Sequence, residues 1–332
     1  MKKDFISIII PYYNCKQWIY RNLDSLVNQT CKEFEVIIVD DGSVDDGLKN
    51  VGAYLEKNKI NFKIIKQKNS GVSVARNEGI KASRGEYLYF LDADDYVELN
   101  LCEVLLKYYR AYKADIIFCG YNKKSEHKAD EKIFNDNYIA EIYDSEEILK
   151  DILNGKLKFH MCAFSVKKDI VVNNNIYFTV GSRFGEDYEF IIKSLIKSKK
   201  TKIIREVLFN YCIRESSVTA EFNLSRLDSI NSAIRVYDYI KNSMSDQEYS
   251  KLASKYVIDK IIYNLKQYSN KANYNDKKLK NDFINIIKQN KSHINYYFHR
   301  EKVTLKRIQK YMTIKYFLEL YINVICLKKI KI

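Results

Sequence analysis

The stretch GEYLYFLDADDYV, Gly85 to Val97, carries an apolar segment directly into three carboxylates. The run EYLYFLD at 86–92 is typical of a buried β-strand, and Asp92, Asp94 and Asp95 lie at or just beyond its end. Carboxylates this close together repel one another and raise each other's pKa unless a positive charge lies among them. The alternative is a solvated loop that caps the next helix, because Asp is a good N-cap residue.

Strands and helices alternate on both sides of this stretch. Short apolar runs predict buried strands at 5–10, 34–40, 62–66, 86–92 and 115–121. Amphipathic spacing predicts helices at 16–28, 45–58, 71–83 and 98–112. A repeated βα order is typical of α/β proteins in which a mixed, mainly parallel sheet carries helices on both faces. We predict this fold class for the N-terminal part of the chain.

The pattern changes towards the C-terminus. It becomes mixed beyond residue 145, and it then predicts helices at 223–242, 247–269, 276–290 and 301–327. Residues 222–332 hold 22 Lys plus Arg against nine Asp plus Glu, which is +13 of the net charge of +14. We therefore predict two domains, 1–220 and a basic helical region at 221–332. Such a charge asymmetry favours a polyanionic partner, either a membrane or a nucleic acid.

Composition excludes several classes of protein. With 46% hydrophobic residues the chain can bury a core, which excludes a disordered protein. The seven cysteines form no CxxC pair, which favours reduced thiols in a cytoplasmic protein without a zinc site. We expect no signal peptide, because the first apolar run, FISIII at 5–10, is short and Pro11 follows it at once. We also expect no transmembrane helix, because the best candidate, 316–327, is short and contains Glu319.

Polar residues gather where the first four predicted strands end. The segments are Pro11 to Asn14, Asp40 to Ser43, Gln67 to Ser70 and the Asp92 group. Ligands of parallel α/β sheets bind outside the carboxyl ends of the strands. The four segments therefore predict the rim of a nucleotide-sized site.

Six segments in one order now support a resemblance: SIIIPYYN (7–14), SLVNQTCKEFEVIIVDDGSVDD (25–46), NSGVSVARNEGI (69–80), GEYLYFLDADD (85–95), GEDYEF (185–190) and YCIRESSVT (211–219). Together they resemble the family 2 inverting glycosyltransferases of the GT-A fold, over about residues 1–220. The resemblance implies that a sugar is transferred from a nucleotide-activated donor with inversion, assisted by a divalent metal. The basic C-terminal region inherits nothing from it.

The resemblance assigns a metal to the carboxylates of the opening stretch. Asp92 and Asp94 match the family's DxD motif, which implies Asp94 as a direct ligand of Mn²⁺ or Mg²⁺ and Asp92 as a ligand nearer the ribose. A hard cation neutralises the charge that develops on a departing diphosphate. The positive charge among the carboxylates would then arrive with the substrate. Asp95 is left to cap the next helix.

Ten residues match the family's nucleotide-sugar-binding positions: Pro11, Tyr13, Asp40, Asp41, Asn69, Arg76, Asp92, Ala93, Arg214 and Ser217. The resemblance implies that Tyr13 stacks on the base, that Asp41 binds the base or ribose, and that Asn69 and Arg76 contact base and phosphate. It also implies that the segment from Arg214 through Ser217 to Thr219 closes over the diphosphate. Ordinary packing, turn formation or surface charge stay open as alternative roles for these residues.

Glu186 and Asp187 match the family's ED motif. The resemblance implies Asp187 as the general base that takes the proton of the acceptor hydroxyl, with Glu186 as its partner. The alternative, a helix that starts with acidic residues, is compatible with this role. His160 departs from the family pattern and is left unassigned.

Two other functions are alternatives to a glycosyltransferase. A nucleotidyltransferase also uses metal-bound carboxylates, but it needs a glycine-rich triphosphate loop, and the loop PYYNCKQW contains no glycine. A nucleic-acid-binding protein would explain the charge, but no helix-turn-helix or zinc signature is present. A dinucleotide enzyme is rejected because no GxGxxG follows the first strand.

The expected partners follow from the glycosyltransferase hypothesis. They are a nucleotide-sugar donor, with a UDP-sugar favoured, and a glycan acceptor that is lipid-linked, as in bacterial capsule and surface polysaccharide synthesis. We expect a cytoplasmic protein whose basic C-terminal segment, 300–332, attaches it peripherally to an anionic inner membrane face. Domain packing or a homo-oligomer interface is the alternative for that segment, and no nucleic-acid partner is expected.

Overall fold

The computed structural model describes residues 5–125, 128–214 and 224–271, together with the single positions 281, 285, 288 and 289. It divides into two compact units. One contains Met1–Ser182 and Glu186–Glu215, and the other contains Arg183–Gly185 and Ser216–Ile332. All of the predicted site residues that are described belong to the first unit.

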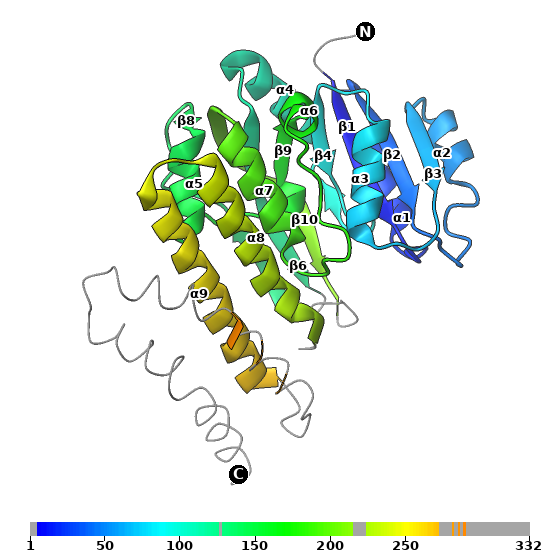
Figure 1. The fold of residues 1–332 in the computed structure, drawn as a ribbon. Helices are drawn as coiled ribbons and strands as arrows, with labels where there is room; N and C mark the ends of the chain where they lie inside the picture. Colours follow the sequence, from blue (N-terminus) through cyan, green and yellow to red (C-terminus); the bar gives the residue numbers. More distant parts are fainter. Residues whose placement is uncertain are drawn as a thin grey trace. The chain divides into compact units, whose positions relative to one another are not determined.

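A single mixed sheet forms the centre of the first unit (Figure 1). In the described residues its order is β3-β2-β1-β4-β9-β6-β10-β5, with β7 beside β6 and β8 beside β10. The strands are β1 (Ile6–Tyr12), β2 (Phe34–Asp40), β3 (Phe62–Lys66), β4 (Tyr87–Phe90), β5 (Tyr96–Val97), β6 (Ile116–Ser125), β7 (Lys128–Ile133), β8 (Tyr143–Asp144), β9 (Phe164–Lys167) and β10 (Lys200–Ile213). β3, β2, β1 and β4 are parallel, as are β6 and β10, while β9 lies antiparallel between the two groups. The predicted fold class is confirmed.

Helices cover both faces of this sheet because its central strands are apolar on both sides. Val36 and Ile38 of β2 pack in one core with Leu23, whereas Ile37 and Val39 pack in another. Side chains alternate along a strand, so burial on both faces needs the unbroken apolar run that β2 has. The helices are α1 (Ile19–Val27), α2 (Val51–Lys57), α3 (Val72–Ala82), α4 (Leu101–Tyr112), α5 (Ser145–Leu153), α6 (Lys168–Asn173) and α7 (Glu186–Lys197), and a 3₁₀ turn, η1, spans Met161–Ala163.

Helix α3 lies very close to β1. A Cβ atom on Gly79 would stand 2.3 Å from Cγ2 of Ile9, a distance that real side chains do not reach. Only glycine therefore allows the helix to approach the strand this closely. Because Arg76 lies one helical turn before Gly79, this contact also sets the height of Arg76 above the sheet.

Several predicted helix starts were wrong. The helix expected at 45–58 begins at Val51, because the Asp45 carboxylate accepts hydrogen bonds from Tyr12 Oη at 2.7 Å and Lys16 N at 3.0 Å and holds the preceding residues in turns. The helix expected at 98–112 begins at Leu101, after the short strand β5. Asp95 therefore does not cap that helix. The helix expected at 16–28 begins at Ile19.

In the second unit, a 3₁₀ turn at Leu224–Leu227 leads into α8 (Asp228–Ser243) and α9 (Gln247–Lys271). The helices lie side by side, and Asn264 of α9 donates a hydrogen bond to Ser229 Oγ at 2.9 Å. Among the described residues, no helix is long and apolar enough to span a membrane. The helices predicted at 276–290 and 301–327, and the membrane segment 300–332, lie outside the continuously described residues.

Candidate active site

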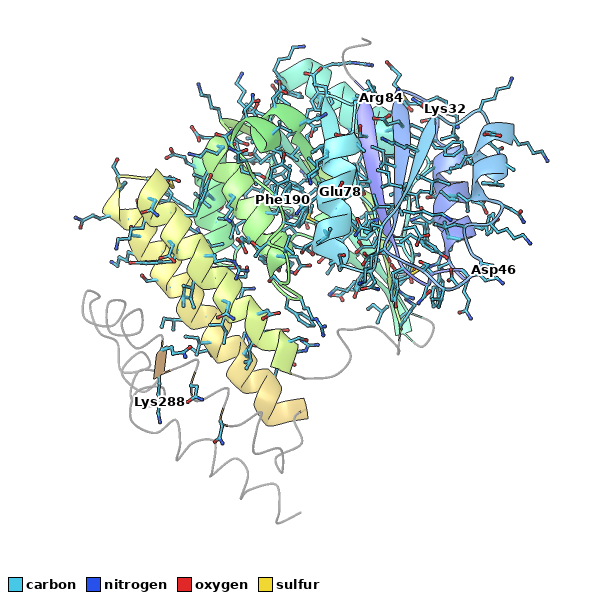
Figure 2. The ribbon with its side chains drawn as sticks, turned by 45° about the vertical axis from the view of Figure 1, so that its right-hand side comes forward. Lys32, Asp46, Glu78, Arg84, Phe190 and Lys288 are labelled. Carbon is cyan, nitrogen blue, oxygen red and sulfur yellow. The ribbon has the colours of Figure 1, made fainter. Side chains whose placement is uncertain are left out.

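The carboxyl ends of β1, β2, β3 and β4 lie at one edge of the sheet. The parallel register places Tyr12 beside Asp40, and Asp40 beside Lys66. Figure 2 shows Asp46, which follows β2, at this edge, and Lys32 and Arg84, which precede β2 and β4, at the opposite edge. The four polar segments that follow the strands are thus brought together, as expected.

Asp41 organises the first part of this edge. Its buried carboxylate accepts hydrogen bonds from Gln67 Nε2 at 2.7 Å and from the backbone N–H groups of Ser70 at 2.7 Å and Gly71 at 2.8 Å. Asp41 therefore ties the end of β2 to the start of α3. Because three hydrogen-bond donors of the protein already contact this carboxylate, Asp41 has a structural role in the loop whether or not it also contacts a nucleotide.

Four of the other predicted nucleotide-binding residues lie at or just after the ends of β1, β2 and β3. Tyr13 is 49% exposed, which leaves its ring available for stacking on a base. Asn69 is also exposed, while Pro11 is half-buried at the end of β1. Asp40 is buried and accepts the backbone N–H of Ser43 at 2.9 Å, as a turn residue would. Their roles towards a nucleotide stay predictions.

Side chains of α1 hydrogen-bond the turn that carries the DxD aspartates. Asn22 is fully buried and its amide donates to the carbonyl oxygens of Asp92 at 2.9 Å and Asp95 at 3.0 Å. Arg21 donates to the carbonyl of Asp94 at 2.6 Å. Neither residue belongs to a motif that indicates a site in the sequence. A polar Asn on the buried face of an amphipathic helix was the signal that could have revealed the first.

Replacing Asn22 by Leu is expected to lower the free energy of unfolding by about 1–3 kcal/mol, because two carbonyl oxygens of the turn lose their donor. The measurement is urea unfolding. Asn28 is the matched control, because its side-chain amide also donates to a backbone carbonyl, that of Asp24 at 2.8 Å, but Asn28 is exposed. Asn28→Leu should stay within about 0.5 kcal/mol of wild type. Equal losses for the two variants would contradict the assigned role of Asn22.

A single buried guanidinium joins the DxD turn to the ED motif. The Arg76 side chain is 4% exposed, and its Nη2 contacts Asp92 Oδ1 at 2.9 Å. Its Nη1 contacts Asp187 Oδ1 at 2.5 Å and Glu186 Oε1 at 3.6 Å. Burial alone would raise the pKa of Asp92, but the Arg76 charge holds that pKa below its ordinary value. The structure thus brings the predicted metal-binding and catalytic carboxylates together.

The two carboxyls of the ED motif differ in accessibility. The Asp187 side chain is 31% exposed, whereas that of Glu186 is 9% exposed. Burial, and then the Asp187 charge, raise the pKa of Glu186 to about 8, against the opposing effect of Arg76. Asp187 is therefore the more accessible carboxyl group of the pair, and Glu186 is the buried one.

The raised pKa of Glu186 predicts a pH-dependent stability. A proton that binds more tightly in the folded state stabilises the protein fully below the unfolded pKa of about 4.3, and this stabilisation is lost as the pH rises through about 8. Glu186→Gln stays neutral, so its free energy of unfolding should rise relative to wild type by up to about 1.4 kcal/mol per pH unit between about pH 5 and about pH 8. Urea unfolding across this range measures the gain, and the exposed Glu147→Gln is the control expected to show none. If the difference in the free energy of unfolding between Glu186→Gln and wild type does not change with pH, Glu186 is not neutral in the folded protein.

Asp94 faces a different arginine. Its carboxylate forms an ion pair with Arg214, whose guanidinium lies 4.0 Å from the centre of the Trp18 ring. Arg214 immediately follows β10, so the end of that strand reaches the DxD turn. Ser217 and Thr219, predicted to continue this segment, lie outside the described residues.

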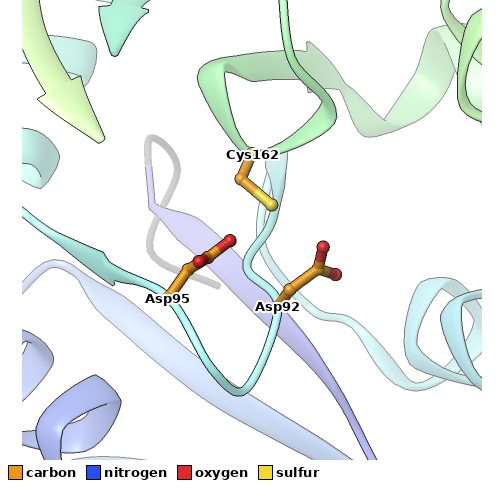
Figure 3. Close-up of side chains that lie close together, drawn as sticks. All are labelled: Asp92, Asp95 and Cys162. Carbon is orange, nitrogen blue, oxygen red and sulfur yellow. The ribbon is translucent and has the colours of Figure 1, made fainter. Parts of the chain in front are cut away.

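The turn offers oxygen ligands that suit a hard divalent cation. Ligand atoms of Asp92, Asp95 and Cys162 lie within 4.8 Å of one another, with the two aspartates on one turn and the cysteine on η1 (Figure 3). Asp95 is buried, its pKa is raised well above the ordinary value by burial, and it accepts the Cys212 N–H at 2.8 Å, so it serves the fold. Asp92 and Asp94, with side chains 33% and 19% exposed, keep oxygens that fit Mn²⁺ or Mg²⁺.

Two further residues lie in or near the turn. Ala93, between the two aspartates, is 3% exposed, so any contact of Ala93 with a sugar nucleotide would come from its backbone. His160, which the sequence left unassigned, stacks on Phe209 with ring centres 5.0 Å apart. Its Nδ1 accepts the Cys162 N–H at 3.2 Å, so the neutral ring carries its proton on Nε2. Burial lowers the pKa of His160, and the charges of Asp92 and Asp187 oppose this shift.

Comparisons with known proteins agree with this geometry. Residues 7–171 match the model of the family described as Glycosyl transferase family 2. The uncharacterized glycosyltransferase EpsJ of Bacillus subtilis is 30% identical over 219 residues, which are 64% of this chain and 62% of EpsJ. The poly(ribitol-phosphate) β-N-acetylglucosaminyltransferase TarP of Staphylococcus aureus is 29% identical over 292 residues, with 84% of each chain covered. The chain thus spans less than two thirds of the length of EpsJ.

A solved structure supports the fold. The crystal structure of residues 1–349 of S. aureus TarS in complex with UDP-GlcNAc has a TM-score of 0.74 to this chain, at 19% identity, covering 96% of this chain and 92% of that one. At this identity the likeness establishes the fold alone. Glycosyltransferases of family 2 are generally assisted by a divalent metal and generally invert the anomeric centre. The chain belongs to glycosyl transferase family 2 and has the GT-A fold.

Proposed function

We propose that this protein transfers a sugar, with inversion, from a nucleotide-diphosphate donor to a hydroxyl group of a glycan acceptor in bacterial surface polysaccharide synthesis. The observation that carries the proposal is the meeting of two carboxylate groups at the carboxyl edge of the sheet. Asp92 of the DxD turn and Asp187 of the ED motif contact the same guanidinium, at 2.9 and 2.5 Å. Donor-side and acceptor-side chemistry can therefore take place within one small region.

Asp187 is the proposed general base. Its partly exposed carboxylate accepts the proton of the acceptor hydroxyl while the hydroxyl oxygen forms a bond to the anomeric carbon. The bond from that carbon to the diphosphate oxygen breaks on the opposite face, which inverts the anomeric centre. A single displacement needs no covalent sugar–protein intermediate, so one accessible carboxylate is sufficient. Glu186, buried beside Asp187, orients it.

Asp94 and Asp92 would hold the divalent metal, which supplies positive charge to the diphosphate as it departs. Arg214 offers a guanidinium, the group that binds phosphate oxygens in a bidentate manner. Its present ion pair with Asp94 places it at the DxD turn. Arg214 would therefore exchange Asp94 for the diphosphate when the donor binds.

A UDP-sugar is the favoured donor. Tyr13 provides an exposed ring for the base. TarS, which shares this fold, has been crystallised with UDP-GlcNAc and with UDP. TarP acts as a β-N-acetylglucosaminyltransferase on a poly(ribitol-phosphate). UDP-GlcNAc and a surface polymer or its lipid-linked precursor are therefore the first donor and acceptor to test.

A donor screen tests the proposal. The protein is incubated with Mn²⁺ and UDP-, GDP- or dTDP-sugars, and release of the nucleoside diphosphate is measured with and without glycan acceptors. We expect UDP release from at least one UDP-sugar, increased by an acceptor. Release of pyrophosphate from a nucleoside triphosphate and a sugar phosphate, with no diphosphate release, would instead identify a nucleotidyltransferase. Family membership gives that alternative, and the nucleic-acid-binding one, no support.

We also propose peripheral attachment to an anionic membrane through the basic region at 222–332, with self-association as the alternative. Basic residues near an anionic surface contribute about 1 kcal/mol each. The 332-residue chain should sediment with anionic liposomes and be released by salt, whereas a chain truncated after Asn295 should stay in the supernatant. If the full 332-residue chain does not sediment with such liposomes at low salt, the membrane proposal is wrong.

A further inference from the structure

Arg76 is buried and bound by carboxylates on two sides. Its side chain is 4% exposed, and its terminal nitrogens contact Asp92 at 2.9 Å and Asp187 at 2.5 Å. The Phe178 ring lies 5.2 Å from the centre of the guanidinium. A residue that binds a donor phosphate needs N–H groups that the donor can reach, as the 23% exposed side chain of Arg214 allows. Arg76 has its terminal nitrogens engaged within the protein, which argues against the phosphate contact predicted from the sequence.

The shape of the guanidinium gives these contacts a geometric meaning. Its nitrogens lie in one rigid plane, so a carboxylate on each side is held at a fixed separation and orientation. Asp92 follows β4, and Asp187 lies in the first turn of α7. These two elements are fixed to each other by one side chain from a third element, α3. A lysine at position 76 would supply the positive charge but not two terminal nitrogens fixed in one plane.

We propose that Arg76 is a positioning residue for the general base, which holds the Asp187 carboxylate at a fixed place relative to the DxD turn and does not bind the donor diphosphate. The inference rests on the proposed transferase activity and specifies how its base is placed. A misplacement of about 1 Å can lower the rate of a transfer reaction on the order of 10²-fold. Arg76 therefore acts on turnover through Asp187.

The test is a double-mutant cycle of Arg76→Lys, Asp187→Asn and the two combined, measured with a UDP-sugar that wild type accepts. Arg76→Lys keeps a positive charge beside the Asp92 and Asp187 carboxylates, so it should fold, as circular dichroism would establish. If it does not fold, Arg76→Lys with Glu186→Gln, measured against Glu186→Gln alone, replaces it, because the amide at position 186 cannot ionise beside the two carboxylates. Arg84→Lys makes the same chemical change at the exposed partner of Glu35 and is the matched control.

We expect Arg76→Lys to lower kcat on the order of 10²-fold, while the dissociation constant of UDP, measured by calorimetry, changes less than about threefold. In the Asp187→Asn background the same change should lower kcat less than about threefold, because residues that act as one unit are not additive. Arg84→Lys should leave both quantities within about twofold of wild type.

Three results would overturn the inference. A UDP dissociation constant raised more than about tenfold, with kcat retained at saturation, would make Arg76 a donor ligand. Losses in kcat that multiply in the double variant would show that Arg76 acts independently of Asp187. A wild-type protein that releases no diphosphate from any nucleotide sugar would remove the proposed function, and with it the base that Arg76 positions.

Discussion

Replacing Asp187 by Asn is expected to lower turnover by about 10² to 10⁴-fold, the usual effect of removing a general base. The amide cannot accept the proton of the acceptor hydroxyl, although it fills the same space at the start of α7. The Asp187 side chain is 31% exposed, so the substitution should not disturb the core. Steady-state kinetics at saturating donor and acceptor measure the loss.

The binding of UDP separates catalysis from affinity in this variant. Asp187→Asn should bind UDP with a dissociation constant within about threefold of wild type, because the lost interaction is with the acceptor. Asp144→Asn is the control, since Asp144 caps α5 through Glu146 N at 2.9 Å and Asn caps equally well. Loss of UDP affinity with turnover retained at saturation would instead make Asp187 a binding residue.

Asp94→Asn is expected to abolish measurable transfer, because the DxD turn would lose one of the two carboxylate charges proposed to hold a divalent cation. Neutral amide oxygens bind Mg²⁺ and Mn²⁺ more weakly than carboxylates do. The fold should survive, since Asp94 lies on a turn at the sheet edge and not in the apolar core. Titrating Mn²⁺ into wild type and variant, with transfer as the readout, measures the effect.

Metal removal gives an independent check on the same residue. EDTA should stop the wild-type reaction, and added Mn²⁺ should restore it. Asp246→Asn is the control, because the Asp246 carboxylate accepts Glu248 N at 2.8 Å at the start of α9, where Asn is an equivalent cap. Transfer by Asp94→Asn at nearly the wild-type rate, with and without EDTA, would show that the metal role is wrong.

The sheet could be predicted from sequence because each central strand is a local pattern. The run FEVIIVD contains four consecutive apolar residues, Val36 to Val39, which burial on both faces requires, and Phe34–Asp40 is the strand that forms. Once these strands are parallel, the polar residues that follow them must share one edge. The start of α2 was harder to predict, because it depends on the Asp45 carboxylate, which bonds a tyrosine 33 residues away.

The partners of Arg76 could not be predicted for the same reason. The two carboxylates that accept its hydrogen bonds lie 16 and 111 residues further along the chain, and helix periodicity alone does not distinguish a surface charge from a buried one. Asn22 is a similar case, since the carbonyl oxygens that it binds are 70 and 73 residues away. The motifs indicated which residues gather at the site, whereas long-range hydrogen bonds determine how they are arranged.

The close approach of Gly79 to Ile9 constrains how homologous chains can diverge. A methyl group at position 79 would stand 2.3 Å from Cγ2 of Ile9, so a larger residue there requires a smaller residue at position 9 or a shift of α3. A shift of α3 would move Arg76, one turn away, relative to both of its carboxylates. Among homologues that retain Arg76 and its carboxylate partners, positions 9 and 79 should therefore covary, with alanine at 79 accompanied by a residue smaller than isoleucine at 9.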